Sequence, residues 1–121
     1  MAKILIVEDE EILAEMYQDK FTQVGYEVFL AFDSREGIEL AKKEKPDLIL
    51  LDILLPDENG IQFLRRIKEI PEINQIPIIA LSNYDEPKIK MEAFSLGVKA
   101  YIIKTNYTPT ELIEIIKKFL V

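Results

Sequence analysis

Five short apolar runs alternate with amphipathic stretches along this chain, and this alternation restricts its fold more than any other feature of the sequence. Each run is rich in aliphatic residues and is short enough to be a buried strand. The predicted strands cover residues 3–8, 26–31, 48–52, 78–82 and 99–103. Strands that alternate with helices imply a parallel sheet covered on both faces. We therefore predict an α/β fold with a doubly wound sheet of five parallel strands and five helices.

The stretches between the strands have helical periodicity and end signals. Four predicted helices cover residues 10–24, 34–45, 61–70 and a segment that begins between residues 85 and 87 and stops at Gly97. A fifth begins with a capping box of Thr108 and Glu111, with Pro109 in the first turn. Its apolar residues span about 160° of the helix surface, which is wider than a core-facing stripe requires. They are Leu112, Ile113, Ile115, Ile116, Phe119 and Leu120. This helix is therefore either packed deeply between neighbours or exposes an apolar strip to a partner.

The composition excludes several classes of function. A chain of 121 residues can bury its own core, and we predict a single domain over residues 1–121. The absence of cysteine and histidine excludes disulfides, thiolate or histidine metal sites and Ser-His-Asp catalysis. A net charge of -7 argues against direct binding of nucleic acid. The longest apolar run, residues 28–32, is too short to span a membrane, and a cytoplasmic location is expected.

Polar side chains follow the predicted strands at the ends where ligands bind in parallel sheets. Glu8 and Asp9 end the first strand, Asp52 the third and Ser82 the fourth, and Lys104 follows the fifth. Taken singly, each residue is typical of a helix cap, a turn or a solvated loop. Because the carboxyl ends of parallel strands meet at one edge of the sheet, the sequence predicts that all five side chains converge there.

The predicted cluster has the chemistry of a metal-assisted phosphoryl acceptor. Three neighbouring carboxylates repel one another unless a cation joins them. Oxygen ligands at a partly open site suit Mg²⁺. A carboxylate beside the ion can act as a nucleophile and form an aspartyl phosphate. A lysine and a hydroxyl can then neutralise the phosphoryl oxygens.

The same residues resemble those of the receiver domain of the response-regulator family of two-component signalling, and the resemblance extends over essentially the whole chain. It includes the spacing D-x-x-x-P-x-x-x-G over residues 52–60 and an aromatic residue three positions before the lysine. The matching residues are Glu8, Asp9, Asp52, Pro56, Gly60, Ser82, Tyr101 and Lys104. The resemblance implies a flavodoxin-like sheet with strand order 2-1-3-4-5.

The resemblance also implies roles for the acidic residues. Asp52 is expected to accept a phosphoryl group from a histidine kinase or a phosphotransfer protein. Asp9 and Asp52 are expected to bind Mg²⁺ through their side chains, with Glu8 assisting through water. The backbone carbonyl of Leu54 is the expected further protein ligand.

Three other residues are expected to contact the phosphoryl group or to respond to it. Ser82 and Lys104 contact it in this family, and Tyr101 is the switch residue that turns inward when the loop of Ser82 closes. Two neighbours depart from the common pattern. Thr105 stands where most members have a proline after a cis bond, and a cis bond is not expected before threonine. Asn83 stands where most members have a smaller residue, beside the expected phosphoryl site.

The function implied is a phosphorylation-activated switch that slowly loses its phosphoryl group to water, and not an enzyme with a diffusible product. Expected partners are the kinase and a downstream protein bound through the fourth helix, fifth strand and fifth helix, with homodimerisation on activation. Nucleic acid and membranes are not expected partners.

Alternative functions are a pseudo-receiver interaction module and a flavodoxin-like binder of a small anionic ligand. An aspartate-nucleophile phosphohydrolase is a further class, but it requires D-x-D after the first strand, where this chain has Glu8-Asp9. Because the sequence ends after the fifth helix, we expect a stand-alone regulator or one domain of a longer protein.

Overall fold

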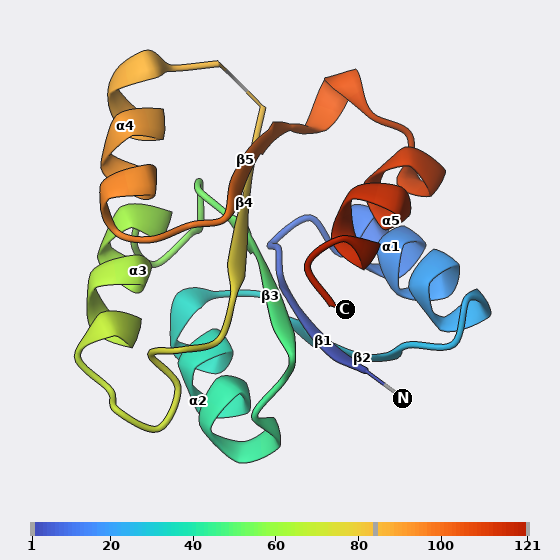
Figure 1. Cartoon of the computed structure of the whole chain (residues 1–121), viewed down its shortest axis with the longest axis horizontal. Helices are drawn as coiled ribbons and strands as arrows, with labels where there is room; N and C mark the ends of the chain where they lie inside the picture. The colour runs from blue at the N-terminus through green and yellow to red at the C-terminus, as the bar shows by residue number, and fades with distance from the viewer. Residues whose placement is uncertain (1, 84, 121) are drawn as a thin grey trace.

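Five parallel strands form one sheet in the computed structural model, which describes residues 2–83 and 85–120 (Figure 1). Their spatial order is β2-β1-β3-β4-β5, which confirms the predicted order. Met1, Tyr84 and Val121, which the predicted domain of residues 1–121 includes, lie outside the described residues. The strands are β1 (Lys3–Val7), β2 (Glu27–Ala31), β3 (Leu48–Asp52), β4 (Ile78–Ser82) and β5 (Ala100–Ile103).

The central strand β3 is buried along its whole length because helices cover both faces of the sheet. Figure 1 shows α1 and α5 on one face and α2, α3 and α4 on the other. The helices are α1 (Glu11–Gln23), α2 (Ser34–Glu44), α3 (Gly60–Lys68), α4 (Pro87–Ser95) and α5 (Pro109–Lys117). Alternate residues of each strand therefore join different cores, as the period of two in a strand requires. Leu48 and Leu50 pack toward α1 and α5, whereas Ile49 and Leu51 pack toward α2, α3 and α4.

Side-chain caps fix where several helices begin. The predicted capping box of α5 is present, with Thr108 accepting from the amide of Glu111 and Glu111 accepting from the amide of Thr108. Asp33 caps α2 by accepting a hydrogen bond from the amide of Glu36. Asn59 caps α3 in the same way through the amide of Gln62. These caps set the positions at which the preceding loops leave the sheet edge.

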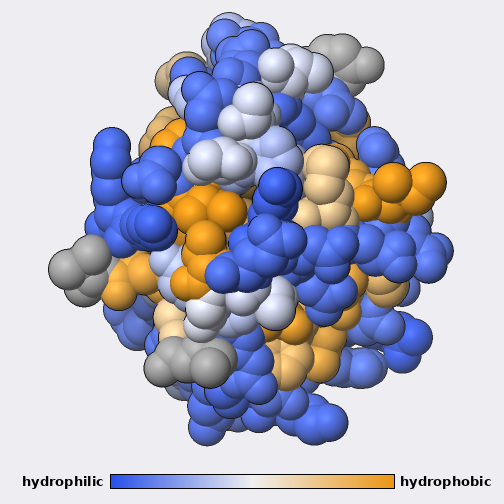
Figure 2. All heavy atoms as spheres, turned by 90° about the vertical axis from the view of Figure 1, so that its right-hand side faces the viewer, coloured by the Kyte–Doolittle hydropathy of each residue, from blue (hydrophilic) through white to orange (hydrophobic). Residues whose placement is uncertain are grey.

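The apolar surface of α5 is largely covered. Leu112, Ile113 and Ile116 are buried, and the other predicted apolar positions of this helix up to residue 120 are half-buried against the same core. Figure 2 views the side of the molecule formed by α1 and α5 and shows apolar areas divided by hydrophilic side chains. Of the two interpretations of this helix, the packed one agrees with the structure.

Most element boundaries agree with the sequence predictions to within one or two residues. The helix α3 ends at Lys68, two residues earlier than predicted, and Glu8 lies just beyond β1 instead of within it. A short 3-10 helix, η1 (Lys104–Asn106), follows β5 and was not predicted. Within residues 2–83 and 85–120, no helix has the length and apolar character needed to cross a membrane.

Candidate functional site

The carboxyl ends of β1 and β3 bring three acidic side chains together. Glu8 and Asp9 directly follow β1, and Asp52 is the last residue of β3. Each contributes one carboxylate oxygen to a group in which all three oxygens lie within 4.8 Å of one another. Glu8 and Asp52 are buried, whereas Asp9 is exposed. The group is therefore open to solvent on the side of Asp9 and closed by the sheet on the other.

Lys104 contacts both buried carboxylates. Its Nζ atom lies 2.6 Å from Oε1 of Glu8 and 3.2 Å from Oδ2 of Asp52. Only 5% of the lysine side chain is exposed, so this residue is not a solvated loop lysine. The end of β5 thus supplies a cation to acids from β1 and β3, although 96 and 52 residues of sequence separate the partners.

Backbone amides hold the other oxygen of each buried carboxylate. The amide of Leu54 donates to Oδ1 of Asp52 over 3.0 Å. The amide of Glu10 donates to Oε2 of Glu8 over 3.1 Å. Each carboxylate is therefore held between one backbone amide and Lys104, which fixes the orientation of both side chains at the sheet edge.

Burial shifts the protonation of this group. Burial raises the pKa of Glu8 to about 7; the bond to Lys104 opposes this shift and the negative charge of Asp52 adds to it. Burial also raises the pKa of Asp52, although Lys104 opposes the shift. For Lys104 itself, burial favours the neutral form, but the bond to Glu8 and the charge of Asp52 outweigh burial and raise its pKa. The lysine therefore stays charged near neutrality, while the two acids compete to retain a proton.

Without divalent metal, the protein is expected to become less stable as the pH rises from about 5 to about 8. The folded-state pKa values of Glu8 and Asp52 exceed their ordinary values. The folded chain therefore binds more protons than the unfolded chain at mildly acidic pH, and this stabilisation disappears as the pH passes the raised pKa. Between pH 5 and pH 8, Glu8 alone should lower the free energy of unfolding by about 2–3 kcal/mol, which corresponds to about 8–12 °C in Tm. Thermal denaturation in chelator at several pH values measures it.

Two controls accompany this measurement. Glu8→Gln should flatten the pH dependence because it removes the carboxyl group whose pKa burial raises to about 7. Mg²⁺ should raise the Tm at pH 8 more than Na⁺ does at the same ionic strength, because coordination differs from screening. A wild-type Tm at pH 8 that equals or exceeds the value at pH 5.5 would contradict the expected sign.

The other residues predicted for the site lie nearby in the fold. Ser82 is buried at the end of β4 and is paired in register with Ile103, the residue before Lys104. Tyr101 lies in β5 opposite Ala80 and is half-buried against the core on the α2–α4 face. The structure thus places Ser82 at the predicted edge and Tyr101 farther back along its strand.

The departures from the family pattern leave Lys104 in contact with the acids. The peptide bond from Lys104 to Thr105 is trans, as are all peptide bonds of the described residues. Thr105 is exposed within η1, and Asn83 is exposed directly after Ser82. Lys104 therefore reaches Glu8 and Asp52 without a proline after it.

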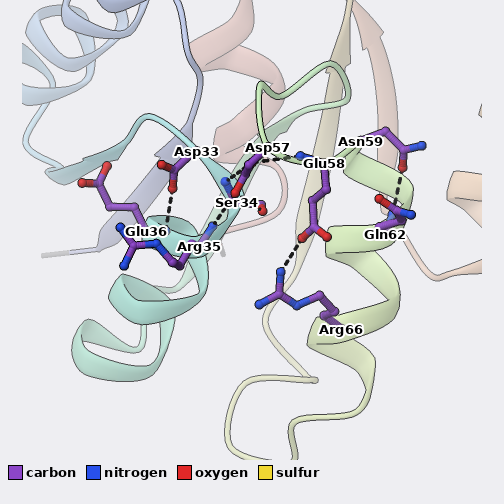
Figure 3. A network of polar contacts seen from close by, with 9 residues as sticks. All are labelled: Asp33, Ser34, Arg35, Glu36, Asp57, Glu58, Asn59, Gln62 and Arg66. Carbon is purple, nitrogen blue, oxygen red and sulfur yellow. Dashed lines mark hydrogen bonds and ion pairs between the residues drawn. The ribbon is translucent and has the colours of Figure 1, made fainter.

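The loop between β3 and α3 contains a residue that the sequence analysis missed. Asp57 accepts hydrogen bonds from the amide and hydroxyl of Ser34 and from the amide of Arg35, at the start of α2 (Figure 3). The partners are 22 and 23 residues apart in the sequence. No local motif links positions so far apart, so the sequence pattern of residues 52–60 did not indicate this contact.

The donor set fits a hard divalent cation. All three clustered side chains offer carboxylate oxygens, the ligands that Mg²⁺ prefers, and the exposed position of Asp9 leaves room for coordinated water. Because the pKa values of Glu8 and Asp52 are raised, an additional positive charge beside these carboxylates would stabilise their ionised forms. The residues present are therefore compatible with a magnesium site.

The fold and the acidic edge together define a receiver domain. A family model described as the response regulator receiver domain matches residues 4–117. The chain belongs to this family of signalling switches, whose members are not conventional enzymes and interact with histidine kinases or phosphotransfer proteins.

Individual relatives agree with this assignment. The polar-differentiation response regulator DivK of Brucella anthropi is 35% identical over an alignment that covers 97% of this chain and 94% of DivK. The chemotaxis protein CheY4 of Vibrio cholerae has a TM-score of 0.92 and 28% identity, with 99% of each chain covered. The BeF3-activated receiver domain of Klebsiella pneumoniae RstA has a TM-score of 0.88 and 28% identity, covering 98% of this chain and 97% of that one.

Proposed function

We propose that this receiver domain is a switch in which Asp52 accepts a phosphoryl group from a histidine kinase or a phosphotransfer protein. The observation that supports it best is the position of Asp52. This carboxylate ends the central strand, lies 3.2 Å from the Nζ atom of Lys104 and shares its surroundings with Glu8 and Asp9. A buried carboxylate, a cation and two further acidic side chains thus lie together at one edge of the sheet, as this function would require.

The acidic residues would hold Mg²⁺. Asp9 and Asp52 would bind it through their side chains, Glu8 would assist through water, and the backbone carbonyl of Leu54 would complete the protein ligands. When bound, the ion neutralises charge on the phosphoryl oxygens. This proposal agrees with the arrangement of Glu8, Asp9 and Asp52 as neighbouring oxygen donors.

The transfer itself requires one bond to form and one to break. An oxygen of Asp52 attacks the phosphorus of the donor phosphohistidine and forms an acyl phosphate. The phosphorus–nitrogen bond breaks, and the imidazole leaves with the electron pair and takes up a proton. Lys104 and the hydroxyl of Ser82 would bind the transferred oxygens and stabilise their charge. Slow attack by water would later release inorganic phosphate and restore the carboxylate.

Phosphorylation would change the surface that partners bind through movements of β5 and the residue that follows it. Lys104 exchanges a carboxylate for a phosphoryl oxygen, and Tyr101 on the same strand would turn inward as the loop of Ser82 closes. The adjacent surface, formed by α4, β5 and α5, would then bind a downstream protein or a second copy. Two large apolar side chains of α4, Met91 and Phe94, are exposed.

Two alternatives fit the site less well. A flavodoxin-like binder of an anionic ligand needs hydrogen-bond donors after β1, whereas this chain has Glu8, Asp9, Glu10 and Glu11 there. A pseudo-receiver has no need for a buried lysine that contacts two buried acids. The retained cluster therefore favours a working acceptor.

Incubation with phosphoramidate and Mg²⁺ tests the proposed function. Intact-mass analysis should show one added phosphoryl group per chain, and hydroxylamine should remove it because acyl phosphates react with this nucleophile. Chelation of the metal should slow the labelling strongly, since the phosphoryl charge is then less neutralised. Absence of an adduct, or an adduct that resists hydroxylamine, would contradict the proposal.

A further inference from the structure

The loop between β3 and α3 is fixed on one side by α3. The amide of Gly60 donates to the carbonyl of Ile53 over 2.6 Å, and Leu54 forms an isolated antiparallel bridge with Asn59. Glu58 pairs with Arg66, which lies nearly two turns along α3 (Figure 3). The loop is therefore a closed turn whose C-terminal half is attached to the helix that follows it.

On its other side the same loop is attached to α2 through Asp57. Oδ1 of Asp57 accepts from the amide of Ser34 over 3.0 Å. Oδ2 accepts from the hydroxyl of Ser34 over 2.7 Å and from the amide of Arg35 over 3.2 Å. Ser34 is fully buried whereas Asp57 is exposed, so the carboxylate binds Ser34 from the solvent side. Figure 3 shows the Asp57 side chain directed at the first turn of α2.

The first turn of α2 is thus capped by two segments of the chain. Its own N-cap residue, Asp33, binds the amide of Glu36, while Asp57 from the loop binds the amides of Ser34 and Arg35. A negative charge at this position is favoured by the helix dipole. Although desolvation opposes it, hydrogen bonding from Ser34 and Arg35 lowers the pKa of Asp57 to about 2. The carboxylate is therefore ionised throughout the physiological range.

Leu54 connects this attachment to the acidic cluster. Its amide holds Oδ1 of Asp52, and it lies three residues before Asp57 in the same closed turn. A displacement of the loop would therefore move both the Leu54 amide, which orients Asp52, and the backbone carbonyl of Leu54.

We propose that Asp57 is a positioning residue for the metal and phosphoryl site, because its bonds to Ser34 and Arg35 fix the loop that contains Leu54. This inference rests on the proposed function, in which the carbonyl of Leu54 is a ligand of Mg²⁺. Asp57 does not touch the metal; it acts through the loop, as groups outside the ligand shell do in other metal sites. The connection is also reciprocal, so metal binding should stabilise the first turn of α2.

A comparison of Asp57→Ala with Asp33→Ala tests this inference. Both variants remove a cap from α2, and each should lower the Tm by about 3–5 °C. Only Asp57→Ala should raise the Kd for Mg²⁺, by roughly tenfold, because only this variant loosens the loop. Calorimetric titration with MgCl₂ gives both Kd values, and Asp33→Ala should keep the wild-type value.

Amide hydrogen exchange provides a second readout that simple capping would not change. In the wild type, Mg²⁺ should slow exchange of the Ser34 and Arg35 amides. This metal-dependent protection should disappear in Asp57→Ala. Ser34→Ala, which removes only the hydroxyl bond, should change the Kd in the same direction by a smaller factor.

The outcomes separate the two proposals. If the wild type binds no Mg²⁺, the proposed function fails and the positioning role fails with it. If the wild type binds Mg²⁺ and Asp57→Ala matches Asp33→Ala in Kd, the positioning role alone is wrong. Should Asp57→Ala fail to fold, Asp57→Asn keeps one acceptor oxygen and should show about a threefold change in Kd, smaller than the tenfold expected for complete removal; an unchanged Kd there would overturn the inference.

Discussion

Replacing Asp52 with asparagine is expected to abolish labelling by phosphoramidate. Asparagine keeps the shape of the side chain and can still accept from the amide of Leu54, but the amide group is a poor nucleophile. The adduct expected in the wild type should therefore fall below detection in intact-mass spectra.

The same substitution should raise the Tm of the metal-free protein, because it removes one of two buried, competing acids.

Two other substitutions serve as controls for this result. Asp19→Asn changes an exposed aspartate of α1 and should be labelled like the wild type. Asp9→Asn should slow labelling by weakening metal binding but should still give an adduct at Asp52. A phosphoryl group that persists in Asp52→Asn would move the acceptor to another residue and refute the assignment.

Replacing Lys104 with methionine should strongly destabilise the metal-free protein at pH 8. Methionine fills a similar volume but leaves Glu8 and Asp52 buried without their cation. Removing one partner of a buried ion pair typically costs about 3–5 kcal/mol, which corresponds to about 12–20 °C in Tm for a domain of this size. The loss should be smaller at pH 5, where the two acids can bind protons. Thermal and urea denaturation at both pH values measure the effect.

Lys117→Met is the matched control because the same residue types are exchanged at an exposed site. Lys117 contacts Glu114 one turn away on α5, and both side chains are about half exposed or more. Such surface pairs contribute at most about 1 kcal/mol. If Lys104→Met costs no more than Lys117→Met at pH 8, the buried contacts of Lys104 do not stabilise the fold as proposed.

The sheet could be predicted from the sequence because its signals are local. Residues 48–51 are apolar on both faces, which is typical of a strand buried within a sheet, and β3 indeed pairs with both β1 and β4. The capping box at Thr108 and Glu111 fixed the start of α5 for the same reason, since both residues lie within one turn. The convergence of Glu8, Asp9 and Asp52 followed from the geometry of parallel strands.

Features that depend on contacts between distant segments could not be predicted. The sequence indicated that Lys104 would lie at the sheet edge, but not that it would be buried between Glu8 and Asp52. The bonds from Asp57 to α2 join segments whose individual patterns indicate only a turn and a helix start. The depth at which α5 packs also depends on its neighbours, so its apolar pattern alone left two interpretations open.

The placement of β3 and β5 in the sheet gives the two halves of the site different numbers of hydrogen-bonded neighbours. Asp52 ends a strand that has hydrogen-bonded neighbours on both sides, whereas Lys104 follows an edge strand that pairs only with β4. Local openings in proteins occur most readily at weakly anchored edges and last in the central strands. Transient release of β5 would therefore withdraw the lysine while leaving the carboxylate of Asp52 in place. If Asp52 is the acceptor as proposed, the phosphoryl group would be received on the strand expected to open last, and the residues proposed to respond would lie on a strand expected to open more readily.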